Sequence, residues 1–188
     1  MVVTLEGLWD KGFAYDVHTV NSAHLGLNEY GHDMFETQRT PMGELVYQLK
    51  YKGRREVARE IVELLIRGIG GLDTVNVIIP CPATRTRPFQ AVEEIAQELG
   101  RRCQRPVTKA LINSGHSQIK DIEDPAERQK CLLESIQLAG DFDFSGQKAL
   151  LLDDLYQTGS TLSVATSLLK AHTNVHRVFA LTMTKTRR

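Results

Sequence analysis

The sequence predicts an α/β fold with a mainly parallel central sheet flanked by helices. Short apolar segments recur near residues 75–79, 107–112, 148–152 and 176–183. Segments with apolar residues spaced three and four apart, typical of amphipathic helices, lie before and between them. Alternating strands and helices favour a parallel sheet, because a helix must carry the chain back to the start of the next strand.

Length and composition are those of an ordinary globular protein. At 188 residues we expect one domain, spanning residues 1–188. Equal numbers of basic and acidic residues give no overall electrostatic argument for nucleic-acid binding. No apolar run approaches the ~20 residues needed to span a bilayer, and no secretory signal is apparent. The three cysteines stand far apart, which argues against a disulfide framework or a four-cysteine zinc site, so we expect a cytoplasmic protein.

The first 41 residues form an N-terminal extension of unclear role, in which residues 13–20 are compatible with a strand. The extension contains three histidines, His18, His24 and His32. Their spacing matches no compact ligand motif, and no acid or cysteine completes a metal-binding set. Surface or locally bonded histidines are the preferred interpretation, and we assign this segment no chemistry.

Two helical patterns follow, one starting at residue 42 and the other ending near residue 67. A basic corner separates them, and its cations are Lys50, Lys52, Arg54 and Arg55. One interpretation is a solvated turn between helices. The other is that Lys50, Lys52 and Arg54 bring positive charge to a polyphosphate.

Two further helices are expected. One follows the loop at 80–90, with Pro88 near its first turn. The other begins at Asp124-Pro125-Ala126-Glu127, which supplies an N-cap, a proline at the first helical position and a glutamate three residues after the cap. The polar segment at 113–123 precedes it.

The stretch at 149–162 carries the chemistry. Its aliphatic run suits a buried strand and ends in Asp153 and Asp154, at the sheet edge where open α/β sheets place ligands. The next helix begins near Gly159, and the first turn of a helix offers unpartnered N–H groups to an anion. Hydroxyl groups are added by Thr158, Ser160 and Thr161. The pattern predicts a phosphate at the turn and a polyol or metal-bearing group at the acids, whereas a merely structural strand and helix would leave the acids unexplained.

This stretch resembles the signature of the type I phosphoribosyltransferases: four apolar residues, two acids and a Thr-Gly-x-Thr loop. The resemblance implies that Asp153 and Asp154 are catalytic, lie under the ribose hydroxyls of phosphoribosyl pyrophosphate and hold Mg²⁺, directly or through water. It implies that the loop binds the ribose 5-phosphate through Gln157, Thr158, Gly159, Ser160 and Thr161. Gln157 departs from the family, which often has Thr or Ser there.

The same resemblance suggests roles for two other loops. The loop after residues 75–79 would hold the pyrophosphate, and Arg85 and Arg87 have suitable forked donors. A flexible hood would contain Gln118, Lys120 and Arg128. Arginines on an exposed loop and a polar connecting loop without catalytic duty are the alternatives.

Residues 43–54 are similar to a stretch of the ComF-like branch of this family, which is associated with DNA uptake; the N-terminal zinc module of many such proteins is absent. Two functions follow from the resemblance. The first is a phosphoribosyltransferase that uses phosphoribosyl pyrophosphate and Mg²⁺, with an unidentified acceptor and a homodimer as an allowed assembly. The second is a non-catalytic module that keeps a sugar-phosphate pocket for regulation or for handling single-stranded DNA. A two-aspartate phosphatase is a weaker alternative. The two acids of such enzymes stand two residues apart, whereas Asp153 and Asp154 are adjacent.

Overall fold

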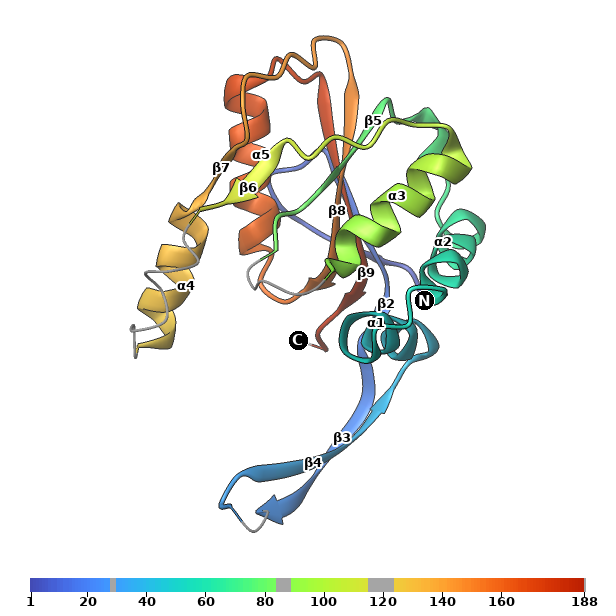
Figure 1. Cartoon of the computed structure of the whole chain (residues 1–188), viewed down its shortest axis with the longest axis vertical. Coiled ribbons are helices and arrows are strands. Elements are labelled where there is room, and N and C mark those ends of the chain that lie inside the picture. The colour runs from blue at the N-terminus through green and yellow to red at the C-terminus, as the bar shows by residue number, and fades with distance from the viewer. Residues whose placement is uncertain (28–29, 84–88, 115–123, 188) are drawn as a thin grey trace.

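A computed structural model describes residues 1–27, 30–83, 89–114 and 124–187, except for the side chains of residues 27, 34–36, 125, 128, 129 and 132. A central sheet has helices on both faces, and a two-stranded arm extends from it (Figure 1). Within the described ranges, no helix has the length and apolar character needed to cross a membrane.

The central sheet confirms the expected architecture. In the described residues it has five strands in the order β1-β2-β9-β8-β5. Their bounds are Val3–Thr4 (β1), Lys11–Val17 (β2), Val77–Pro80 (β5), Lys148–Tyr156 (β8) and Arg177–Lys185 (β9). Strands β2, β9, β8 and β5 run parallel, and β1 adds an antiparallel edge. The parallel strands therefore all end at one edge of the sheet.

Helices bury both faces of this sheet. The helices are Pro41–Lys52 (α1), Val57–Gly68 (α2), Ala91–Cys103 (α3), Pro125–Glu134 (α4) and Ser160–His172 (α5), with a short 3₁₀ helix at Leu72–Thr74. Leu150 and Leu152 of β8 belong to the core under α1, α2 and α3, whereas Leu151 belongs to the core under α5. A strand that is buried on both faces has a continuous aliphatic sequence, so residues 148–152 can be identified as a strand from the sequence alone.

The prediction that residues 107–112 form a strand of the parallel sheet is wrong. Val107 makes a single parallel bridge to Ile78, and Pro106 has no N–H group with which to extend that ladder. The chain then forms β6 (Leu111–Asn113), which pairs antiparallel with β7 (Ile136–Leu138) in a separate ribbon.

The N-terminal extension is part of the sheet. The strand expected at 13–20 is broken at His18: β2 ends just before it, and β3 (Thr19–Leu27) begins just after it. Strand β3 pairs with β4 (Asp33–Arg39) to form the arm that projects from the body (Figure 1). The Nε2 atom of His24 lies 2.7 Å from a carboxylate oxygen of Asp33, within hydrogen-bond distance, across this arm.

The chain returns from the arm into α1 through a close backbone contact. The Thr40 hydroxyl accepts a hydrogen bond from the Gly43 amide (3.0 Å) and donates one to the Val17 carbonyl (2.7 Å). A Cβ atom at Gly43 would lie 2.1 Å from the carbonyl oxygen of His18. Helix α1 is thereby fixed against the end of β2.

This contact predicts that Gly43→Ala destabilises the protein. In a helix interior, alanine is more stable than glycine by about 1 kcal/mol. At this position, however, the added methyl group would collide with backbone that cannot move aside. We expect a net loss of about 1–3 kcal/mol in the free energy of unfolding, measured by urea denaturation. Gly70→Ala is the control, because a Cβ atom there would meet nothing within 4 Å. Equal stability of the two variants would contradict the close packing of α1 on β2.

Candidate active site

The two adjacent acids lie inside strand β8, which continues to Tyr156 instead of ending near residue 152 as expected from the sequence. Asp153 is aligned with Thr182 of β9. Because successive side chains of a strand point to opposite faces, Asp154 shares the face of α1 and Asp153 shares the face of α5. The strand thus places the two carboxyl groups in different surroundings.

Asp154 faces α1 and forms an ion pair with the Lys50 ammonium group. The side chain of Asp154 is only 10% exposed and that of Lys50 is 25% exposed. A carboxylate this far from water needs a partner, because an uncompensated buried charge is strongly destabilising. Lys50 is the partner of this carboxylate.

Asp153 is half-buried on the other face of the strand. One of its carboxylate oxygens accepts a hydrogen bond from the Asp154 amide at 2.8 Å. Burial and then the negative charge of Asp154 raise the pKa of Asp153 from 3.8 to about 7, against the smaller opposing effects of this hydrogen bond and of Lys50. Asp153 is therefore partly protonated near neutral pH.

Two buried groups lie beside Asp153. The pKa of the Cys81 thiol is raised well above its usual value by burial and by the charges of Asp153 and Asp154. A protonated thiol is a poor nucleophile, so the site offers no cysteine for covalent catalysis. The buried Thr182 hydroxyl, on the strand next to Asp153, has no hydrogen-bond partner among the described residues.

His18 belongs to the same region, although the sequence analysis gave it no chemistry. Its Nδ1 lies 3.0 Å from the Thr184 hydroxyl, which donates to the Asp154 carbonyl at 3.2 Å. Because Thr184 has one proton to donate, Nδ1 of His18 must be the donor in their bond. Burial, and then the charge of Arg39, lowers the pKa of His18, which favours the neutral ring. The place of His18 in the site cannot be predicted from the sequence, since the pairing of β2 with β9 joins distant parts of the chain.

The turn between β8 and α5 offers backbone donors at the edge where the parallel strands end. Gly159, the N-cap residue, has a left-handed conformation (φ 76°, ψ 3°) and has no side chain with which to cap the first turn of α5. The first N–H groups of a helix lack partners within the helix. The Thr158 hydroxyl lies 2.7 Å from the Ser160 hydroxyl and 3.4 Å from the Ser160 amide, a long contact that an anion can replace. The turn therefore presents backbone and hydroxyl groups at this edge.

Tyr156 explains why this turn needs glycine. A Cβ atom at Gly159 would lie 2.8 Å from the Tyr156 ring, in addition to the unfavourable positive φ. The ring is held in place by an edge-to-face contact with Trp9, with centroids 6.3 Å apart. Tyr156 thus supports the turn on one side.

The basic corner of the sequence is divided in the structure. Lys50 reaches Asp154, whereas the Lys52 ammonium group lies 5.7 Å from the centre of the Tyr47 ring. Arg54 donates hydrogen bonds of 2.8 Å to both Glu56 and Gln48.

Other residues named from the sequence are not placed by the structure. Arg85, Arg87, Gln118 and Lys120 lie outside the described residues. Arg128 lies in α4, and its side chain is outside the description.

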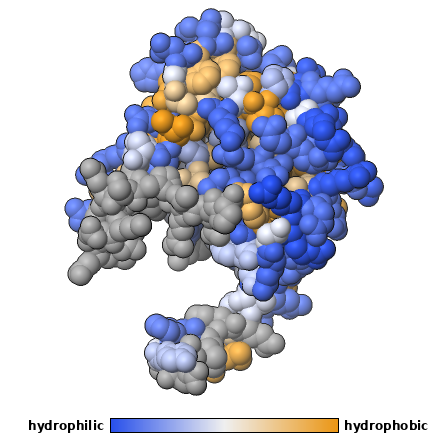
Figure 2. All heavy atoms as spheres, in the orientation of Figure 1, coloured by the Kyte–Doolittle hydropathy of each residue, from blue (hydrophilic) through white to orange (hydrophobic). Residues whose placement is uncertain are grey.

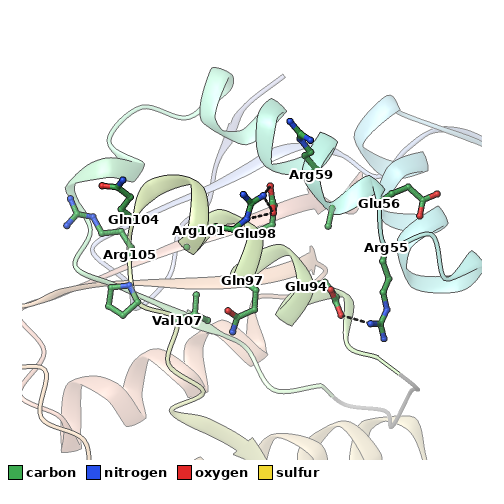
Figure 3. Close-up of a pocket in the computed structure, with 13 residues that line it drawn as sticks. Arg55, Glu56, Arg59, Glu94, Gln97, Glu98, Arg101, Gln104, Arg105 and Val107 are labelled. Carbon is green, nitrogen blue, oxygen red and sulfur yellow. Dashed lines mark hydrogen bonds and ion pairs between the residues drawn. The ribbon is translucent and has the colours of Figure 1, made fainter.

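A groove of about 890 Å³ between α2 and α3 is separate from the acids and the turn (Figure 3). Three of its four lining arginines are paired with glutamates: Arg55 with Glu94 at 3.6 Å, Arg59 with Glu63 at 3.5 Å and Arg101 with Glu98 at 2.5 Å. The fourth, Arg105, donates to the backbone carbonyl of Asp73. The surface over these helices is hydrophilic (Figure 2). Because three of these four arginines are paired with acids, the attraction of the groove for a polyphosphate is reduced.

The acid pair is compatible with a metal that arrives with a substrate. The described residues contain no group of three His, Cys, Asp or Glu side chains that could hold a metal ion. Mg²⁺ is usually bound by one or two carboxylates together with substrate phosphates, and it keeps several waters. Because Asp153 and Asp154 lie on opposite faces of β8, a metal ion in that mode would use one of these carboxylates together with the substrate.

Comparisons with known proteins show a likeness to phosphoribosyltransferases. No family model and no curated protein matches the sequence. The adenine phosphoribosyltransferase of Thermoanaerobacter pseudethanolicus is 14% identical, with a TM-score of 0.47 over 87% of this chain and 95% of that chain. The Trypanosoma brucei enzyme, solved with AMP, pyrophosphate and ribose-5-phosphate, is 14% identical, with a TM-score of 0.47 over 96% and 73% of the two chains. For the orotate phosphoribosyltransferase of Aeropyrum pernix the identity is 14% and the TM-score 0.43, over 86% and 71%.

The raised pKa of Asp153 predicts how stability depends on pH. Between the ordinary pKa of 3.8 and about 7, the folded protein holds a proton that the unfolded chain has released. The free energy of unfolding should therefore fall as pH rises through this window. Asp153→Asn should remove this component, which urea denaturation at a series of pH values would measure. Asp141→Asn, at an exposed position, is the control; an unchanged slope in Asp153→Asn would contradict the assignment.

Proposed function

We propose that the protein is a phosphoribosyltransferase that binds phosphoribosyl pyrophosphate with Mg²⁺ and transfers the phosphoribosyl group to an acceptor still to be identified. One observation carries this proposal: a helix without a side-chain cap opens directly after a strand that bears two acids. A sugar phosphate has the matching groups, an anion for the helix start and a diol for the carboxyl groups.

In the proposed complex the 5-phosphate lies at the turn formed by residues 157–161. Backbone N–H groups and the helix dipole favour an anion at the start of α5. The hydroxyls of Thr158, Ser160 and Thr161 are further donors. Those of Thr158 and Ser160 would exchange their mutual hydrogen bond for bonds to the phosphate. Gly159 leaves the backbone open to close approach because it has no Cβ atom.

The ribose hydroxyls are assigned to the acids. Asp153 is partly exposed and, when ionised, accepts from the diol, whereas Asp154 is the fixed charge held by Lys50. In the reaction a lone pair of the acceptor forms a bond to the anomeric carbon while the bond to pyrophosphate breaks, and pyrophosphate leaves with that electron pair. Positive charge develops on the ribose ring, and nearby carboxylates stabilise it. Mg²⁺ bound with the substrate would supply compensating charge for the leaving group.

The remaining roles follow the resemblance of the sequence. Arg85 and Arg87 are proposed to bind the pyrophosphate, and Arg128 is proposed for a hood over the acceptor. Forked guanidinium donors match the oxygens of a pyrophosphate.

A second candidate function, handling of single-stranded DNA by a ComF-like module, is favoured by an aromatic pair on α1. The rings of Tyr47 and Tyr51 have centroids 5.3 Å apart, and Tyr51 is 59% exposed. The Arg39 guanidinium lies 3.8 Å from the centre of the Tyr47 ring. Aromatic rings beside cations are the usual platform for unpaired bases. The basic corner itself supports this candidate less, because Lys50 and Arg54 are paired with acids.

The direct test of the transferase is isothermal titration calorimetry with phosphoribosyl pyrophosphate and Mg²⁺. We expect binding by the wild-type protein and a loss of at least about tenfold in affinity for Asp153→Asn, since a hydrogen bond to a charged group is removed. Gly159→Val should lose binding through strain at its positive φ. Asp141→Asn should bind like the wild type. Absence of binding at millimolar ligand by folded wild-type protein would reject the proposal.

The DNA-handling candidate predicts a different phenotype. Tyr51→Ala should weaken binding of a single-stranded oligonucleotide by at least about fivefold, because stacking contributes about 1–3 kcal/mol per base. Fluorescence anisotropy over a range of salt concentrations measures this affinity and its electrostatic part. Unchanged affinity in Tyr51→Ala would exclude the aromatic pair as the platform.

A further inference from the structure

Lys50 occupies the position at Asp154 that a metal ion would need. Its ammonium group contacts one oxygen of a carboxylate whose side chain is only 10% exposed. We propose that Lys50 is a built-in counter-cation that competes with divalent metal for Asp154, so that metal binds firmly only when it arrives with the anionic substrate. The identity of that substrate rests on the proposed function; the competition itself concerns Lys50, Asp154 and a divalent cation.

The fold fixes Lys50 at this place. Helix α1 begins at the Thr40 cap and the close approach of Gly43 to β2, and Leu49 next to Lys50 is fully buried. The lysine stem therefore starts from a rigid turn of helix beside β8. Since Asp154 has almost no access to water, the ammonium group acts in place of solvent and makes an ionised carboxylate tolerable there.

A metal ion and an ammonium group repel each other when they share one carboxylate. In the absence of substrate, a divalent ion must displace the Lys50 ammonium group from Asp154, which makes metal binding weak. Phosphate oxygens that arrive with the metal offer this group a partner, because lysine is a flexible point charge well suited to phosphate. Lys50 thereby couples metal binding to substrate binding.

Among the residues that the structure describes, the neighbouring basic groups do not duplicate this role. Arg39 lies 3.6 Å from Glu44 and stacks on Tyr47. His18 bonds to Thr184, and burial and nearby cations favour its neutral ring. Lys52, two residues from Lys50, has its ammonium group near the Tyr47 ring. Lys52 is therefore a matched control that removes the same charge from the same end of α1.

The test measures Mn²⁺ binding without any sugar phosphate, from the electron paramagnetic resonance signal of free Mn²⁺. We expect Lys50→Met to bind Mn²⁺ at least about tenfold more tightly than the wild type, since a competing positive charge is gone. Lys52→Met should bind like the wild type. The double variant Lys50→Met/Asp154→Asn should lose the gain. Equal Mn²⁺ affinity in Lys50→Met and wild type, or tight binding retained in the double variant, would overturn the proposal.

A measurement on the wild-type protein covers the case in which Lys50→Met does not fold. Acetylation by acetic anhydride, followed by mass spectrometry, compares Lys50 with Lys52 in the same protein. We expect Lys50 to react more slowly than Lys52, and tens of millimolar Mg²⁺ to raise the reactivity of Lys50 alone. Unchanged Lys50 reactivity on adding Mg²⁺ would contradict the exchange.

The outcome separates this inference from the proposed function. Wild-type binding of phosphoribosyl pyrophosphate together with unchanged Mn²⁺ affinity in Lys50→Met would reject the competition and leave the transferase proposal in place. Tighter Mn²⁺ binding in Lys50→Met without any binding of phosphoribosyl pyrophosphate would support the competition and reject the transferase.

Discussion

The ion pair between Lys50 and Asp154 is the constraint on which the arrangement of the site depends. It joins α1 to the strand between β5 and β9, at a depth where a lone carboxylate would be unstable. To bring Lys50 there, α1 must start directly on the end of β2, which the Thr40 cap and the absence of a side chain at Gly43 allow. The N-terminal strand, α1 and the acid pair thus form one connected unit.

Strand geometry then gives two consecutive acids two different characters. Asp154 lies on the α1 face with a cation, whereas Asp153 lies on the α5 face, where burial favours its protonated form. In enzymes, paired titratable groups whose pKa values are pushed apart commonly divide acid, base and electrostatic tasks between them. A fixed charge and an adjustable carboxyl group, both next to a turn rich in backbone donors, form a site suited to a ligand that carries hydroxyls as well as phosphate.

The local features of the fold could be predicted from the sequence, and the non-local ones could not. Two features depend only on residues that are adjacent in the sequence: the apolar run at 148–152 and the donor-rich turn around Gly159. For this reason β8 and α5 can be predicted from the sequence. The continuation of β8 through Asp153 and Asp154 was not, because aspartate is depleted in strands and reads as a strand end. The pairing of β2 with β9, which brings His18 to Thr184, joins residues more than 160 positions apart. Lys50 was singled out only as part of a basic corner, because its partner depends on how α1 packs against β8.

A crystal structure of the protein with Mg²⁺ and phosphoribosyl pyrophosphate tests the central claim most directly. The account predicts the 5-phosphate against the backbone amides at the start of α5, the ribose hydroxyls beside Asp153, and the Lys50 ammonium group moved from Asp154 towards phosphate oxygens. A ligand bound instead in the groove between α2 and α3, with the turn at Gly159 empty and Lys50 still on Asp154, would contradict it.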